Sequence, residues 1–589
     1  MPLVDRALGR VLYIDLTTKR YWVKFRPDLF EKYLGGTGVA TKLVKEELHR
    51  NTDPLGPGNV VVMAVGVMTA MYPTASKTVA MFKSPLTGNV GESHAGGRSA
   101  VAIRMAGYGA VVIKGSSDIP VYLSIHDGIV EFKDATALWG VRSTYTIGRV
   151  LREREPWSGL RSIMRIGRAG ENLVRYAGVV TETYRHFGRL GLGAVWGSKK
   201  LKAVVVGGKR SVPVADPVKY RKVYEEIYKL MVESPVMRKY HDLGTAANVI
   251  NLNTIGALPT RNLTSTRFEN AGAISGEHLA ENALARRVAC SHCPVACIHI
   301  AAIREEYPHE KYFYTTRYVP YDYEPIYSLG SMLGIGSHEG LLRLIEEVEV
   351  QGLDAMSTGV VLAWATEAFI KGLVGRAETI VEPSWGDWST YIRMVRYIVD
   401  QPNEFYKALA QGVERAAERY GGADFALAFG RNEMPGYHTG PAAHLGYLIG
   451  ARHSHLDSAG YSYDEKLIGK EYPEPEKVVD DLIAEEAWRQ VLSSLVVCYF
   501  ARGVYKPDVV SRALKPLGME LGVEDLRKLG MEIYKEKYKL KLDLGFDVSK
   551  LRLPKRIFET VTPHGLVRRE FMSRALEHFR KRVEELVKP

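Results

Sequence analysis

The sequence predicts an α+β protein in which a β-rich N-terminal domain precedes two mainly helical domains. Two observations lead to this prediction: short β-branched runs in the first third of the chain, and apolar residues at helical spacing after Val218. At 589 residues, the chain is longer than one hydrophobic core normally serves, so several domains are expected.

Five apolar runs near the N-terminus predict strands, because Gly and Pro residues separate them as they do at strand ends. These runs are 11–16, 60–65, 110–113, 121–125 and 203–206.

Helical spacing dominates the rest of the chain, as in Leu341, Leu344, Ile345 and Val348, and again in Ile483, Ala487, Val491 and Leu495. Breaks rich in Pro and polar residues at 211–217 and 432–439 suggest domain boundaries. We therefore predict domains at 1–211, 212–431 and 432–589.

Composition and charge narrow the class of protein. Hydrophobic residues make up 46% and charged residues 25%, as in globular proteins. The N-terminus lacks the apolar core of a signal peptide, and the best apolar stretch, 360–365, is too short to span a bilayer. We expect a cytoplasmic protein that does not enter a membrane.

A net charge of +12 is compatible with nucleic acid, a phosphorylated substrate or an acidic protein partner. The charges are interspersed, and the sequence has no groove-reading module or basic stripe, which disfavours nucleic acid. Glutamine is confined to Gln351, Gln401, Gln411 and Gln490, which favours a thermophilic source.

The four cysteines point to a metal centre. Cys290, Cys293 and Cys297 form a C-x2-C-x3-C triad, and Cys498 is the fourth. Four thiolates suit either a structural zinc ion or a [4Fe–4S] cluster. Zinc sites favour two C-x2-C pairs, so this spacing favours iron, and a disulfide framework is not expected in a chain without a secretion signal.

The triad with its distant fourth cysteine resembles the tungsten-containing aldehyde:ferredoxin oxidoreductases, over nearly the whole chain. The segments 83–88 (KSPLTG), 93–97 (SHAGG), 106–108 (AGY) and 185–199 also resemble this family. The resemblance implies a β-rich domain on which a tungsten or molybdenum bis-pterin lies, covered by two helical domains, and a [4Fe–4S] cluster.

The resemblance places the pterins against two N-terminal segments. A pterin phosphate needs close backbone approach and cationic partners. We expect the cofactor contacts to include Ser93, His94, Ala95, Gly96, Gly97, Arg185, His186, Gly188, Arg189 and Gly191. Carbonyl groups near His94 and His186 are expected to hold a magnesium ion between the two phosphates. No acidic ribose ligand follows the glycines at 191–197, so a dinucleotide site is rejected.

The family recognises each pterin ring with a motif at a helix end, Asp-x-x-Gly-Leu-Asp or Asp-x-x-Gly-Leu-Cys. Here EVQGLD supplies Glu349, Leu353 and Asp354, whereas SSLVVC replaces the second carboxylate with Ser493 and places Val497 before the cysteine.

Two further positions depart from the family. Lys77 stands where the family has an arginine between pterin and cluster, and it keeps the charge but not the two-pronged guanidinium. Arg343 stands where some relatives have a glutamate ligand, so no mononuclear iron is expected.

The expected reaction is oxidation of an aldehyde to a carboxylic acid. Glu324 matches the family's active-site glutamate, and we expect burial to raise its pKa and make it the general base. His455 falls near the active-site histidine, with His453 as a competitor. Asp457 replaces a family lysine, so we expect the local charge to be reversed.

The resemblance implies ferredoxin, or a ferredoxin-like subunit, as electron acceptor, and a homo-oligomer is a further expectation. An acidic ferredoxin would suit the positive surface. Two alternatives stay open: oxidation of a phosphorylated aldehyde such as glyceraldehyde-3-phosphate, and a zinc-stabilised basic protein that binds nucleic acid.

Overall fold

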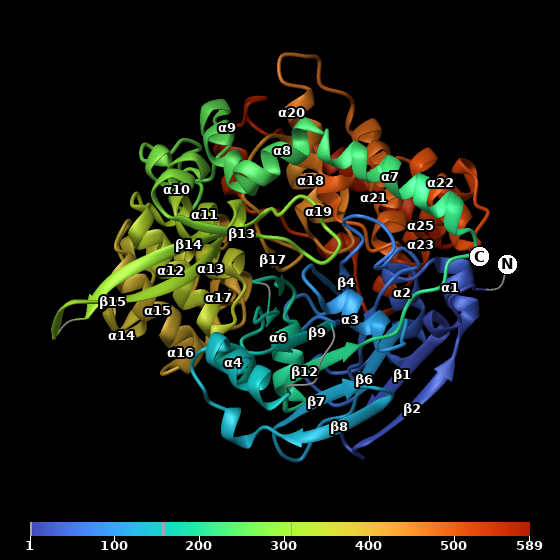
Figure 1. Ribbon diagram of the computed structural model, residues 1–589. Coiled ribbons are helices and arrows are strands. Elements are labelled where there is room, and N and C mark those ends of the chain that lie inside the picture. Colours follow the sequence, from blue (N-terminus) through green and yellow to red (C-terminus); the bar gives the residue numbers. More distant parts are fainter. Residues whose placement is uncertain (1–2, 156–159, 183, 308, 589) are drawn as a thin grey trace.

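The computed structural model describes residues 3–155, 160–182, 184–307 and 309–588. It confirms the α+β class, with two sheets at the N-terminal end and helices through most of the remainder (Figure 1). Among the described residues, no helix has both the length and the apolar character needed to cross a bilayer.

The first sheet has the strand order β2-β1-β6-β3-β4-β5. Only the β1–β6 pairing is parallel among these strands. The strands are β1 (Arg10–Asp15), β2 (Arg20–Phe25), β3 (Val61–Ala64), β4 (Thr78–Lys83), β5 (Val90–Ala95) and β6 (Ala110–Lys114). The β-branched runs form the central strands because both faces of the sheet are covered.

The second sheet has the order β11-β10-β9-β12-β7-β8. All residues of its inner strand β12 are buried, which explains the unbroken apolar run. Its strands are β7 (Val121–His126), β8 (Ile129–Asp134), β9 (Leu160–Arg165), β10 (Val179–Val180), β11 (His186–Phe187) and β12 (Leu201–Gly208). The edge strands β5 and β11 contact each other, so His94 and His186 lie where the two sheets meet.

Short helices lie among these strands and flank the two sheets (Figure 1). They are α1 (Pro27–Tyr33), α2 (Gly36–Glu47), α3 (Ser99–Met105), α4 (Thr144–Arg154), α5 (Arg168–Glu171) and α6 (Leu192–Ser198).

The middle of the chain is mainly helical. Its helices are α7 (Pro217–Val232), α8 (Pro235–Asp242), α9 (Asn248–Ile255), α10 (Gly276–Asn282), α11 (Tyr323–Leu329), α12 (His338–Gln351), α13 (Ala355–Ile370), α14 (Arg376–Thr379), α15 (Trp388–Asp400), α16 (Glu404–Leu409) and α17 (Val413–Tyr420). The apolar stripe expected on 341–348 is buried on α12.

The last part of the chain packs helices against both the middle region and the first sheet. They are α18 (Pro441–Ile449), α19 (His455–Ser458), α20 (Gly460–Lys466), α21 (Pro475–Ser494), α22 (Pro507–Leu514), α23 (Val523–Asp543), α24 (Arg556–Glu559) and α25 (Arg569–Val587). Helices α21 and α23 contact α2, which brings the end of α21 beside the N-terminal sheets.

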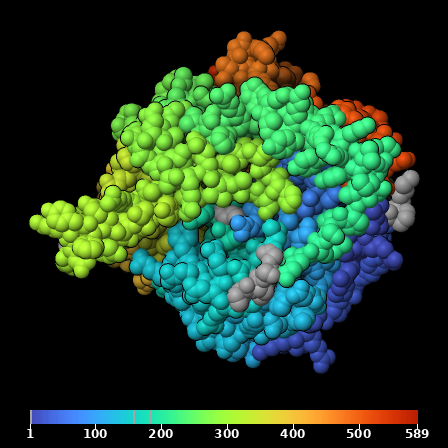
Figure 2. Space-filling model, viewed as in Figure 1, coloured from blue at the N-terminus to red at the C-terminus, as the bar shows by residue number. Residues whose placement is uncertain are grey.

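A β-hairpin interrupts the helical region where the sequence pattern gave no expectation of strands. Strands β13 (Leu284–Val288), β14 (Ile298–Tyr307) and β15 (Glu310–Tyr321) form a three-stranded sheet, and a short pair, β16 (Ala428–Phe429) and β17 (Asn432–Glu433), follows later. The outer part of the β14–β15 hairpin projects from the body as an arm (Figure 2). The cysteine triad lies between β13 and β14, at the base of this sheet.

Candidate active site and metal centre

The four cysteines, far apart in the sequence, are brought together by a three-way backbone junction. The amide of Thr74 donates to the carbonyl of His292 inside the triad loop, at 2.9 Å, and the amide of Cys498 donates to the carbonyl of Thr74, at 3.1 Å. Segment 74–77 therefore joins the triad to the fourth cysteine.

Two cysteines of the triad have raised thiol pKa values. Burial first, and then the neighbouring cysteines, raise the pKa of Cys293 to about 12. Burial raises the pKa of Cys297 to about 11, although Arg185 opposes it. Thiolates in this place need positive charge nearby, which a bound metal would supply. Among the described residues, no three His, Cys, Asp or Glu side chains lie close enough to share a single metal ion.

Two cations lie between the cysteines and a neighbouring cavity. A Cβ atom on Gly96 would lie 2.8 Å from the Sγ of Cys290 and 3.3 Å from the Nζ of Lys77, so a side chain there would separate them. Arg185 points its Nη2 toward the Sγ of Cys297 at 3.8 Å, and its Nη1 donates to Asp322 at 3.3 Å. Arg185 thus bridges the cysteines and the cavity wall.

The cavity has a volume of about 290 Å³ and lies between the two sheets and the helical regions. Most of the residues that the sequence singled out line it: Lys77, Ser93, His94, Gly96, Arg185, His186, Gly188, Arg189, Glu324, Glu349, Leu353, Asp354, His455, Val497 and Cys498. The cysteine triad, Ala95, Gly97, Gly191 and Ser493 are not part of its wall. Gly97 instead accepts a hydrogen bond from the amide of Ser291 at 2.9 Å and so anchors the triad loop.

The first helix-end motif joins α12 to α13. Gly352 ends α12 with φ +76°, a left-handed conformation that favours glycine. Asp354 begins α13 by capping the amide of Met356 at 3.0 Å. The turn aims Glu349 at His186, 2.7 Å away, and Asp354 at the Nε of Arg189, 3.1 Å away. The Nη1 of Arg189 is buried without a hydrogen-bond partner among the described residues, beside the cavity.

The second motif has a different geometry. Ser493 hydrogen-bonds to the hydroxyl of Tyr499, and it is Tyr499 that borders the cavity. Val496 stands where the family has glycine, yet it keeps φ +57°, which is strained for a β-branched residue. Its carbonyl accepts from the amide of Lys77 at 3.1 Å, so this strained turn positions the lysine beside the cysteines.

Glu324 and His455 meet at the cavity, although they come from α11 and α19. The Nε2 of His455 lies 3.3 Å from the Oε1 of Glu324, and the hydroxyl of Tyr437 donates to the same oxygen at 3.1 Å. The Nδ1 of His455 is buried without a partner in the described part of the chain.

The expectation of a raised pKa for Glu324 is wrong. Burial alone would raise the pKa of Glu324, but the hydrogen bond and charge of His455 outweigh it, so the pKa is lowered. Asp322 is the carboxyl group with the raised pKa. Burial, and then repulsion from Glu324, raise the pKa of Asp322 to about 6. The site therefore has one ionised carboxylate and one that titrates near neutrality.

Of the two competing histidines, His455 borders the cavity. His453 points away from it: its Nδ1 lies 3.0 Å from the carbonyl of Leu448, and its Nε2 lies 2.8 Å from the Nζ of Lys541.

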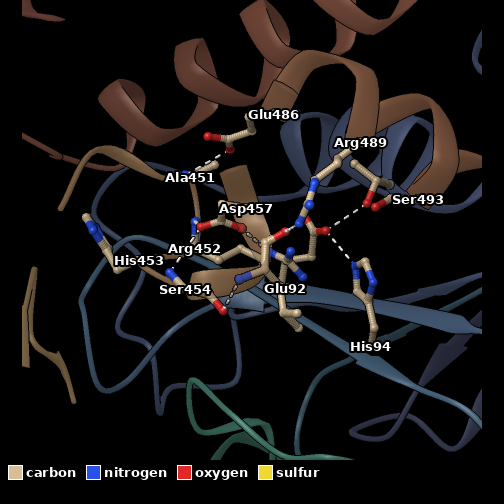
Figure 3. Close-up of polar contacts among 12 residues, drawn as sticks. Glu92, His94, Ala451, Arg452, His453, Ser454, Asp457, Glu486, Arg489 and Ser493 are labelled. Atoms are coloured by element: carbon tan, nitrogen blue, oxygen red, sulfur yellow. Dashed lines mark hydrogen bonds and ion pairs between the residues drawn. The ribbon is translucent and has the colours of Figure 1, made fainter. Parts of the chain in front are cut away.

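Asp457 does not reverse the charge of the cavity. Its carboxylate accepts from the amides of Arg452 at 2.9 Å and Ser454 at 3.1 Å and from the Nε of Arg452 at 2.5 Å (Figure 3). Arg452 lines the cavity and Asp457 does not, so the group at the cavity wall is a guanidinium whose charge is paired with Asp457.

Behind this wall lies a buried ion pair. The Oε2 of Glu92, on β5, lies 2.6 Å from the Nζ of Lys537, on α23, and its Oε1 lies 2.6 Å from the Nε2 of His94. Burial lowers the pKa of His94 to about 4, so its imidazole is neutral and donates to Glu92.

Sequence patterns missed several of these residues. Asp322 lies two positions before Glu324 in the same YDYEP segment, so the paired acids were a signal that could have been used. Arg452 lies near His455 in ARHSHLD, but nothing in the pattern shows that its side chain lines the cavity. Tyr437 and Glu92 come from distant segments, so only the fold brings them to the site.

Two family models of known proteins match most of this chain. Residues 11–208 match the family model described as aldehyde ferredoxin oxidoreductase, N-terminal domain, and residues 222–585 match its domains 2 and 3.

Individual relatives cover most of the chain. A tungsten-containing aldehyde ferredoxin oxidoreductase of Thermococcus kodakarensis is 33% identical over 95% of this chain and 92% of its own. The Pyrococcus furiosus protein of the same name is 32% identical with the same coverage. An aliphatic sulfonate oxidoreductase, WOR-like subunit, from Pyrococcus furiosus is 30% identical over 69% of this chain and 66% of its own.

A solved structure shares the fold. The active site complex BamBC of benzoyl coenzyme A reductase, with 1,5-dienoyl-CoA, superposes with a TM-score of 0.83 at 20% identity, covering 99% of this chain and 95% of that chain. With two family models spanning nearly its whole length, the chain is an enzyme of the aldehyde ferredoxin oxidoreductase family.

Proposed function

We propose that this enzyme uses a tungsten, or molybdenum, bis-pterin to oxidise an aldehyde to a carboxylic acid, and passes the electrons through a [4Fe–4S] cluster to ferredoxin. Relatives named tungsten-containing aldehyde ferredoxin oxidoreductases support the metal and the reaction. The single observation that carries the proposal furthest is the Glu324–His455 pair, which faces the same cavity as the cysteine junction and the first helix-end motif.

The residues present fit a bis-pterin. The buried Nη1 of Arg189 lacks an acceptor in the described chain and borders the cavity, as a phosphate or ring oxygen would require. The lack of a side chain at Gly96 lets the Sγ of Cys290 and the Nζ of Lys77 approach the cavity wall, where a cluster would lie close to the cofactor. The contact of β5 with β11 brings the backbone near His94 and His186 together, which supports the proposed magnesium site.

The second pterin would meet a different wall. Tyr499 and Arg452 border the cavity where the family motif would supply a carboxylate. These groups recognise a ring by stacking and by donating hydrogen bonds.

In the proposed reaction, an aldehyde and water become a carboxylate, with release of two electrons and three protons. The metal–pterin centre would accept the electrons. Glu324, held ionised by His455, accepts a proton from the attacking water or hydrate. His455 donates to the developing oxyanion, and Tyr437 fixes the orientation of the Glu324 carboxylate. Asp322 holds Arg185 between the site and the cysteines.

Glu324→Gln tests the proposal, because it keeps the size of the side chain and removes the base. We expect kcat to fall by about 10² to 10⁴, while metal content, pterin content and melting temperature stay unchanged. Glu404→Gln, at an exposed position on α16, is the matched control. A loss smaller than about tenfold, below the range for a general base, would remove Glu324 from the role, and His455→Asn would then be the next variant to measure.

Two narrower proposals concern the electron acceptor and the substrate. An acidic ferredoxin is the proposed acceptor because the chain carries a net charge of +12. A phosphorylated aldehyde such as glyceraldehyde-3-phosphate is the second candidate substrate. Four cations that could meet a phosphate line the cavity together with five carboxylates; the cations are Lys77, Arg185, Arg189 and Arg452. Membership of an enzyme family sets aside the zinc-stabilised nucleic-acid-binding alternative.

A further inference from the structure

A surface groove lies next to the catalytic cavity and has no assigned role. It has a volume of about 610 Å³ and runs between helices α7 and α8 on one side and the segment from Phe500 to α22 on the other. Its apolar lining consists of Leu230, Val236, Met237, Val504 and Val509. Leu230 and Val236 are 42% and 52% exposed, an apolar surface that a ligand would cover.

Phe500 connects the groove to the catalytic cavity. Phe500 borders both spaces, so it is part of a wall that the two share. On the other side its ring stacks on Tyr240 of α8, with centroids 4.4 Å apart and planes at 20°. Gly503, three residues later, is exposed and has no close neighbour around its Cβ position.

The groove is lined by three cations, Arg502, Lys506 and Arg512, and by two acids, Glu226 and Asp508. Arg512 is already paired with Glu226 at 2.7 Å and with Asp508 at 3.2 Å. By contrast, Arg502 and Lys506 form no ion pair with any carboxylate in the part of the chain that the structure describes. Arg502 donates its Nη1 to the carbonyl of Tyr499 at 2.9 Å, which holds the guanidinium at the groove beside Phe500.

We infer that this groove binds the far end of the substrate, and that the substrate is an aldehyde with an apolar chain ending in an anionic group. The chain covers the apolar lining, the anion meets Arg502 and Lys506, and the aldehyde passes Phe500 to reach Glu324 and His455. The anion is a carboxylate, sulfonate or phosphate, which share the same recognition by cations. This inference deepens the proposed function and rests on it for the reaction, but not for the binding.

Binding is tested first, with unreactive probes. Octanoate and 1-octanol have the same chain and differ in the anionic end, so calorimetry compares their affinities for the holoenzyme. The wild type should bind octanoate more tightly. In the double variant Arg502→Gln/Lys506→Gln, the ratio of the affinity for octanoate to that for 1-octanol should fall about tenfold, as expected for hydrogen bonds to a charged group. Arg221→Gln, which removes an exposed cation of α7 outside the groove, should change nothing.

Turnover then links the groove to the reaction. Two aldehydes of equal length, one ending in a methyl group and one in a carboxylate, are oxidised with benzyl viologen as acceptor. The ratio of kcat/KM for the two should fall about tenfold in the double variant, mainly through KM. Sulfonate-ended and phosphate-ended aldehydes identify the preferred anion.

The outcomes separate the possible failures. An unchanged octanoate preference in the double variant overturns the groove assignment. A rate that falls equally for both aldehydes, and only with ferredoxin as acceptor, also overturns it, because the groove would then dock the electron carrier. If octanoate binding follows the prediction but the wild type oxidises no aldehyde, the groove assignment stands as a binding site and the proposed reaction is refuted.

Discussion

The buried pair of Glu92 and Lys537 allows a prediction about stability that does not depend on any cofactor. Each side chain is 1% exposed, and their charged atoms lie 2.6 Å apart, joining β5 of the first sheet to α23. Lys537→Met keeps the aliphatic volume and removes the lysine charge, while Glu92 keeps its hydrogen bonds from Thr37 and His94. Removing one partner of a buried pair costs about 3–5 kcal/mol, so we expect a loss of that size near neutral pH.

The pH dependence has a definite sign. Burial alone would raise the pKa of Glu92, but the charge of Lys537 and then the hydrogen bond from His94 hold this pKa well below its usual range. In the wild type, the stabilisation is present above the unfolded pKa of Glu92 and is lost as pH falls through the folded pKa. In Lys537→Met we expect the burial effect to dominate and to raise the pKa of Glu92. The penalty should therefore shrink in mildly acidic buffer, where the carboxyl becomes neutral.

Urea unfolding measured by circular dichroism, near neutral pH and in mildly acidic buffer, gives the free energies. Hydrogen exchange on β5 and α23 shows whether the loss is local, since a chain of several domains need not unfold in one step. Lys535→Met, at a half-buried position on the same helix that forms no ion pair with a carboxylate in the described chain, is the control. Adding Glu92→Gln to Lys537→Met should restore more than half of the loss. A single variant as stable as the wild type, or a loss that does not vary with pH, would refute the reasoning.

Three further predictions concern the site. Because Asp322 titrates at about 6 beside an ionised Glu324, kcat/KM should rise as pH passes that value. Asp322→Asn should remove this inflection from the pH profile. If the inflection remains in the variant, it belongs to another group. Gly352→Ala should lower the free energy of unfolding by at least about 1–2 kcal/mol, since φ is +76° and the new Cβ would lie 2.9 Å from the amide nitrogen of Gly167. The control is Gly272→Ala, whose new Cβ would have no atom within 4 Å. Equal melting temperatures for the two variants would contradict the prediction. Reduction of an acidic ferredoxin should slow as salt is added, and a rate independent of salt would count against electrostatic docking.

The order of β-rich and helical regions was predictable because local patterns are strong there. All five apolar runs near the N-terminus lie in or overlap strands, and the stripe on 341–348 lies on α12. The β14–β15 hairpin was not predicted. Its aromatic residues, such as Tyr312 and Phe313, lie on an exposed arm, so the usual alternation of buried and exposed positions is absent.

The candidate site was predictable where a residue belongs to a local motif. Glu349, Asp354 and the cysteines fall into this group, because their spacing is visible in the sequence. The pKa of Glu324 was predicted in the wrong direction, because burial was considered without the partner that lies 131 positions later, His455. The charge of Asp457 was misjudged for the same reason, since its Arg452 partner turns a local acid into a neutral pair. The individual roles of these residues stay predictions.

The metal content of the anaerobically purified enzyme tests the central claim most directly. Elemental analysis by mass spectrometry should find about four irons per chain, as a cube held by four thiolates requires, together with tungsten or molybdenum. Cys498→Ser should strip the cluster or leave a three-iron species while the tungsten or molybdenum remains. One zinc per chain, with no iron, tungsten or molybdenum, would contradict the account.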